Sequence, residues 1–120
     1  MQGLEVEIGG KSYPFRFTVN NLADMEEKAG KTVMDLLVGV DNVGFATLRL
    51  FFWAGFRNPP YRGLTIEAAG QMLADYLDAG RNMQDALKMV YDTLEVCGFI
   101  KNQQAEVTEA APTSAEPTQN

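Results

Sequence analysis

The segment 43–57 constrains the fold more than any other part of the chain, because its sequence, VGFATLRLFFWAGFR, is apolar on every side of a helix. Such a helix needs other elements to cover each of its faces, so we expect it to be the central core element. Asn58-Pro59-Pro60 ends it, since proline cannot continue helical hydrogen bonding. Thr47 and Arg49 interrupt the apolar run, which falls well short of the roughly 20 residues needed to span a bilayer. The segment therefore predicts a buried helix and no membrane span.

The N-terminal segment predicts a β-hairpin. Apolar and polar residues alternate in 4–8 and again in 11–17, and Gly9-Gly10 separates the two runs. A two-residue type I′ turn needs positive φ at both positions, which glycine supplies. Such a turn pairs Ile8 with Lys11, and the apolar side chains of both strands then share one face.

Pro14 determines which edge of this hairpin is available. It has no N–H, so a further strand beside the second strand is disfavoured. The free edge is then that of the first strand, residues 3–8, which carries Glu5 and Glu7. We favour edge protection by these glutamates, and the alternative is that the edge pairs with another chain.

Four further helices are predicted around the central one, because each apolar stripe follows a capping residue. Thr18 to Asn21 offer caps for a helix that Gly30 closes, and Thr32 opens a short second helix. Thr65 and Asn82 cap the last two helices, which end near Gly80 and Gly98. The predicted fold class is α+β: an N-terminal two-stranded β-hairpin followed by about five short helices, mostly α.

The composition changes near residue 101. Residues 101–120 contain no aromatic residue and one sizeable apolar side chain, Val107. A segment of this kind cannot bury enough apolar surface to offset its ordering entropy. We expect a folded domain over 1–100 and a flexible, disordered tail over 101–120. The N-terminus has no signal-peptide pattern, so a soluble intracellular protein is expected.

The residue types available limit the chemistry. The 120 residues include no histidine and a single cysteine, Cys97, so the usual neutral-pH base and a Cys/His metal cluster are missing. We expect no enzymatic activity, no cofactor, and no catalytic or metal-binding residue. The net charge is −6, from 10 basic and 16 acidic residues, which argues against partners such as nucleic acid or an anionic membrane.

The aromatic central helix also carries the candidate partner-binding residues. Arginines interleaved with aromatics could form a single-strand nucleic-acid platform, but core packing is the favoured interpretation. Arg49 and Arg57 need carboxylates on an otherwise apolar surface, and internal ion pairing is favoured over pairing with a partner. Two interpretations of this helix are open. Its exposed members bind a partner, or its aromatic residues all lie in the core, and we favour the second interpretation. The candidates are Phe52, Trp53, Phe56 and Arg57, together with the edge of the first strand.

Three blocks of the sequence resemble a known family. They read GGKSYPFRFTVNNLADMEEKAGKTV, RLFFWAGFRNPP and LTIEAAGQMLADYL, and the resemblance covers roughly residues 4–97. Together they resemble the tail assembly chaperones of long-tailed bacteriophages, nearest the subgroup that includes a tail protein of gene transfer agents. The resemblance implies a non-enzymatic assembly factor of a phage or prophage.

The resemblance also implies partners and a location. Chaperones of this family bind the tape measure protein and help recruit tail tube subunits around it, in the host bacterial cytoplasm, and they are generally absent from the mature virion. Self-association is left open. Some members also yield a longer product by ribosomal frameshifting, to which 101–120 would be a linker. The alternatives are a small structural tail protein, tube-associated and kept in the virion, and a host-directed adaptor.

Overall fold

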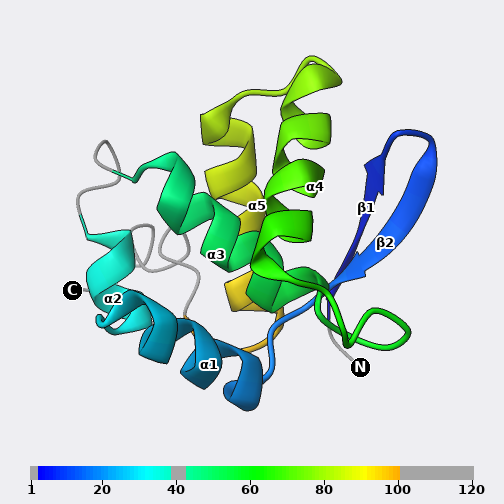
Figure 1. Cartoon of the computed structure of the whole chain (residues 1–120). Helices are drawn as coiled ribbons and strands as arrows, with labels where there is room; N and C mark the ends of the chain where they lie inside the picture. The colour runs from blue at the N-terminus through cyan, green and yellow to red at the C-terminus, as the bar shows by residue number, and fades with distance from the viewer. Residues whose placement is uncertain (1–2, 39–42, 101–120) are drawn as a thin grey trace, which may run out of the picture.

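The computed structural model describes residues 3–38 and 43–100, and within them the chain is α+β, as predicted. A two-stranded antiparallel hairpin precedes five helices, and α3 lies at the centre of the helical part (Figure 1). The elements are β1 (Leu4–Ile8), β2 (Lys11–Phe15), α1 (Val19–Ala29), α2 (Val33–Leu37), α3 (Phe45–Phe56), α4 (Ile66–Asp78) and α5 (Met83–Val96).

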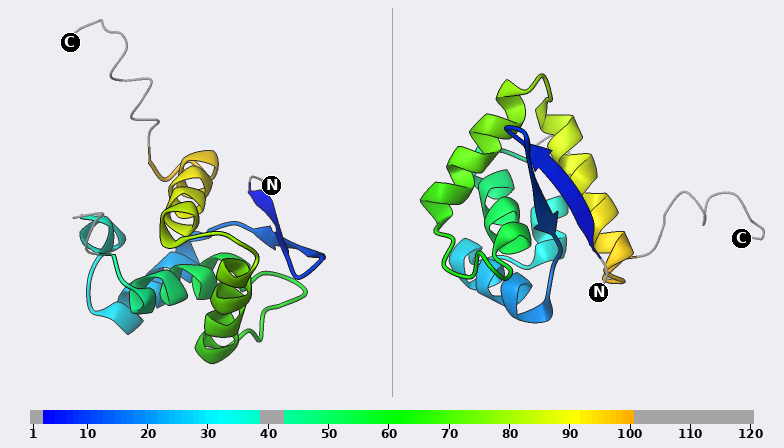
Figure 2. Two further views of the ribbon diagram at one scale, coloured as in Figure 1. Left: turned by 90° about the horizontal axis from the view of Figure 1, so that it is seen from above. Right: turned by 90° about the vertical axis from the view of Figure 1, so that its right-hand side faces the viewer.

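The hairpin has the predicted turn and register. Gly9 and Gly10 have φ values of 61° and 80°, and Ile8 pairs with Lys11. Val6 and Phe15 are buried on the inner face. The hairpin lies beside α4, and Figure 2 shows it from its own side with α4 and α5 flanking it.

The C-terminal half of α3 forms the centre of the core. Every residue from Phe51 to Phe56 is buried, so the helix is covered on all sides, as its sequence predicts. The Phe52 ring contacts rings from two other elements, with centroid distances of 6.0 Å to Phe15 and 5.5 Å to Tyr76. Helices α1 and α4 and strand β2 pack against this helix.

Hydrogen bonds from the backbone and from the Asn58 side chain attach the end of the hairpin to the end of α3. The Arg16 N–H donates to the Gly55 carbonyl at 3.0 Å, and the Asn58 side-chain amide donates to the Arg16 and Gly55 carbonyls at 3.1 and 2.7 Å. Position 55 must be glycine for this approach, because a Cβ there would lie less than 3.0 Å from three ring carbons of Phe15. The hairpin and the central helix therefore form one unit.

The predicted N-caps are confirmed. The side chains of Thr18, Thr32, Thr65 and Asn82 each accept a backbone N–H at the start of a helix. The boundaries differ slightly, since the central helix begins at Phe45 rather than at 43. The sequence predicts an apolar stripe from Val33 to Val40 for the second helix; the helix ends at Leu37, and Val40 lies outside the described residues.

Two further predictions concern the ends of the chain and the membrane. The predicted boundary at 100 and the tail over 101–120 lie outside the described residues. Among the residues that are described, no helix has the length and apolar character needed to cross a membrane.

Candidate partner-binding surface

The three aromatic candidates lie in the core. Phe52, Trp53 and Phe56 are each at most 6% exposed, because the hairpin, α1 and α4 cover the faces on which they lie. The Trp53 Nε1–H donates to the Leu64 carbonyl at 3.0 Å, which fixes the indole. The premise that these rings are exposed is therefore wrong, and they pack the core as the favoured interpretation expected.

The fourth candidate, Arg57, pairs within the chain. Its Nη2 donates to Asp24 Oδ2 at 2.6 Å and to Asn21 Oδ1 at 2.8 Å, and its guanidinium lies 4.1 Å from the centre of the Trp53 ring. Its Nε is buried and has no hydrogen-bond partner among the described residues. Internal ion pairing, the favoured interpretation, is thus confirmed for Arg57, which joins α3 to α1.

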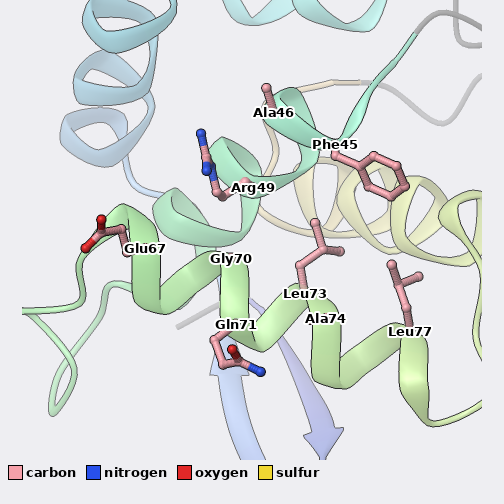
Figure 3. Close-up of a pocket in the computed structure, with 9 residues that line it drawn as sticks. All are labelled: Phe45, Ala46, Arg49, Glu67, Gly70, Gln71, Leu73, Ala74 and Leu77. Atoms are coloured by element: carbon pink, nitrogen blue, oxygen red, sulfur yellow. The ribbon is translucent and has the colours of Figure 1, made fainter.

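Arg49 differs from Arg57, because it is exposed and has no side-chain hydrogen bond or ion pair within 3–38 and 43–100. It lies in a groove between α3 and α4 with a volume of about 550 Å³ (Figure 3). The sequence suggested two equivalent arginines on α3, but only one of them is used internally. We name this groove the α3–α4 groove; its lining residues are Phe45, Ala46, Arg49, Glu67, Gly70, Gln71, Leu73, Ala74 and Leu77.

The α3–α4 groove has an apolar end and a charged end. Phe45 is 60% exposed and lies at the apolar end. Figure 3 shows the Leu73 and Leu77 side chains extending from α4 toward the same end of the groove. Arg49 and Glu67 lie at the other end. This arrangement can take an apolar side chain at one end and a charged one at the other, as an amphipathic helix presents them.

Gly70 shapes the middle of the groove. A Cβ at this position would lie 3.0 Å from Arg49 Cδ, so the missing side chain gives the arginine stem its place across α4. The lining also includes the small residues Ala46 on α3 and Ala74 on α4.

The sequence did not single out Phe45 as a binding residue. It belongs to the apolar run, and nothing in the run distinguishes residues that the fold covers from residues that it leaves exposed. The one usable signal is its position in the first turn, since a residue at the end of a central helix can extend past its neighbours.

The free edge of β1 is the other predicted contact. In the observed register, the backbone groups of Glu5 and Glu7 face away from β2. Arg81 Nη1 donates to the Glu7 carbonyl at 2.7 Å, and its guanidinium lies 4.4 Å from the centre of the Tyr76 ring. One outward carbonyl is thus occupied from within the chain, which favours edge protection over pairing with another chain.

Metal-ligating groups do not converge in the part of the chain that the structure describes. No group of three or more His, Cys, Asp or Glu residues there could hold a metal ion. Cys97 is half-buried, and its Sγ accepts the Phe17 N–H at 3.5 Å. Burial raises the pKa of Tyr76, which packs on Phe52 in the core. The α3–α4 groove is therefore the candidate site, and it offers contact chemistry.

Comparisons with protein-family models, with curated proteins and with solved structures give no match for this chain. The resemblance to tail assembly chaperones stays a prediction.

Proposed function

We propose that this chain is a non-catalytic tail assembly chaperone of a long-tailed phage, prophage or gene transfer agent, and that it binds the tape measure protein. One structural observation carries the proposal beyond the resembling sequence blocks: the α3–α4 groove, in which an exposed Phe45 lies beside apolar and charged lining residues. A groove of this composition suits the apolar face of an amphipathic helix.

The groove suggests how such a helix is held. The Phe45 ring and the partly exposed Leu77 side chain contact apolar residues of the tape measure helix, and the buried Leu73 supports them from below. Arg49, which has no ion pair of its own among the described residues, forms one with a carboxylate on that helix. Binding thus covers apolar surface on both partners.

Covering of this kind explains the assembly role. A long amphipathic protein exposes apolar surface along its length and aggregates unless that surface is hidden. Several copies of this chain coat the tape measure protein in the host bacterial cytoplasm until tail tube subunits assemble around it. The chaperone then leaves, and the mature virion lacks it.

The test is co-expression with the tape measure protein, followed by co-purification and titration with a helical segment of that protein. The wild-type chain should raise the solubility of the tape measure protein and retain it. Phe45→Ser should weaken binding about tenfold or more, as loss of a central apolar anchor does.

Val19→Ser is the matched control, because Val19 is 69% exposed and lies on α1, outside the α3–α4 groove. Both variants should keep the thermal stability of the parent to within about 1 kcal/mol. If the wild-type chain neither retains nor solubilises the tape measure protein, the function is wrong. If Phe45→Ser binds like Val19→Ser, the groove is the wrong surface. Detection of the chain by mass spectrometry in purified virions would exclude release.

A further inference from the structure

A second cavity, of about 440 Å³, lies where the end of the hairpin, the start of α1 and the segment after α3 meet. It shares no lining residue with the α3–α4 groove. Three arginines line it, Arg16, Arg57 and Arg62, against one carboxylate, that of Asp24. This concentration of positive charge is unusual in a chain with 10 basic and 16 acidic residues.

Two of these arginines have no counter-ion among the residues that the structure describes. Asp24 already pairs with Arg57 at 2.6 Å, so the only lining carboxylate is used. Within residues 3–38 and 43–100, the side chains of Arg16 and Arg62 form no hydrogen bond or ion pair. Since like charges brought to one cavity repel, an anion placed between them would be stabilised by both.

The start of α1 adds further donors to the arginine cluster. Thr18 is the N-cap of this eleven-residue helix, and both it and Asn20 line the cavity. The first turn holds no acidic side chain, so the positive end of the helix is not neutralised locally. The Asn21 N–H already donates to Thr18 Oγ1, and the Val19 and Asn20 N–H groups, which have no intrahelical partner, can donate to an oxyanion.

The walls of the cavity are held in place by buried and half-buried amides. The Asn21 side-chain amide donates to the Ala54 and Arg57 carbonyls, both at 3.1 Å, and the Asn58 amide donates to the Arg16 carbonyl at 3.1 Å. Two of the three arginines are thereby fixed at the backbone. The backbone that carries Arg16 is therefore in place before any ligand arrives, which lowers the entropic cost of binding.

We propose that this cavity is a binding site for a small oxyanion, a phosphate or carboxylate group, held by Arg16, Arg62 and the N-terminus of α1. The planar fork of a guanidinium donates two parallel hydrogen bonds to such groups. A nucleic acid is a poorer fit, because the net charge of −6 repels a long polyanion while the local charge attracts one group. The site does not depend on the chaperone proposal.

The experiment is an NMR titration of the full chain, labelled with ¹⁵N, at constant ionic strength. Inorganic phosphate and triglutamate are the two probes, and sodium chloride is the reference. We expect saturating shifts of the Val19 and Asn20 amides and of the Arg16 and Arg62 side-chain N–H groups. Arg16→Gln and Arg62→Gln should each raise the dissociation constant at least fivefold.

Lys31→Gln is the matched control, because it removes one positive charge from an exposed side chain that lines neither this cavity nor the α3–α4 groove. It should leave the dissociation constant unchanged. Saturation by phosphate alone identifies a free phosphate-type ligand, and saturation by triglutamate alone identifies carboxylates of a protein segment. The site would be overturned by equal shifts with chloride, by equal weakening in Lys31→Gln, or by the absence of saturation with either probe. Thermal unfolding of Arg62→Gln confirms that the variant is folded.

Discussion

The contact between Gly55 and the Phe15 ring makes a strong prediction about stability. Gly55 lies inside α3, where a Gly→Ala substitution ordinarily gains about 1 kcal/mol from helix propensity. Here the added Cβ would lie less than 3.0 Å from three ring carbons of Phe15. The ring is fully buried and packs against Phe17, Phe52 and Phe56, so it has no free space to move into.

The expected magnitude follows from these two opposed effects. Forcing extra volume into a packed core costs about 1–3 kcal/mol, and displacing a buried phenylalanine ring altogether costs about 3–5 kcal/mol. Because the ring cannot shift within the core, we take the larger cost and subtract about 1 kcal/mol of helix propensity. Gly55→Ala should therefore lower the free energy of unfolding by about 2–4 kcal/mol, a fall in Tm on the order of 10 °C or more.

Urea unfolding measures this change, followed by the fluorescence of Trp53, the one tryptophan of the chain, and by far-UV circular dichroism. Gly63→Ala is the matched control, because its added Cβ would meet nothing within 4 Å and its φ is outside the left-handed region. It should change stability by less than about 1 kcal/mol. On a Phe15→Leu background, Gly55→Ala should cost at least about 1 kcal/mol less, since the ring edge is gone. A Gly55→Ala protein as stable as its parent would refute the described packing of hairpin on helix.

Three further predictions concern a helix cap, an ion pair and an alkaline transition. Asn82→Ala removes the N-cap of α5 and should cost about 1 kcal/mol in urea unfolding. Asp24→Asn leaves the Arg57 guanidinium without its carboxylate and should lower the free energy of unfolding by about 1 kcal/mol. The effect should be smaller at high salt, because Asp24 is 46% exposed. Asp92→Asn, which removes the carboxylate of an exposed pair, should change the free energy of unfolding little. The folded state raises the pKa of Tyr76 by burial, so above pH 10.0 the unfolded state releases a phenolic proton that the folded state keeps, and stability falls as the pH rises. Tyr76→Phe should lose less stability than the parent between neutral and alkaline pH.

The hairpin and the helix starts were predictable because neighbouring residues determine them. The Gly9-Gly10 turn sets the pairing of Ile8 with Lys11, and a one-residue slip would move every apolar side chain to the wrong face. A cap such as Thr65 bonds an N–H three residues later. Such interactions leave a local pattern in the sequence.

The candidate surface was not predictable, because interactions between distant residues create it. Arg49 and Arg57 have the same spacing relative to Trp53, and only the packing of α1 places Asp24 against one of them, 33 residues away in sequence. The α3–α4 groove likewise depends on Gly70, which allows the Arg49 stem to cross α4. No pattern within α3 contains this information.

The two halves of α3 therefore contribute to different properties, the C-terminal half to stability and the N-terminal half to the proposed binding surface. Its C-terminal half, Phe51–Phe56, is buried under the hairpin, α1 and α4, so substitutions there act on stability first. Its first turns expose Phe45 and Arg49, which contribute little to the core and line the α3–α4 groove. Since the two regions share one rigid helix, the core fixes the orientation of the groove without using its side chains. Substitutions at Phe45 should change partner binding without changing stability, whereas Gly55→Ala should lower the free energy of unfolding while the folded chain keeps the groove side chains.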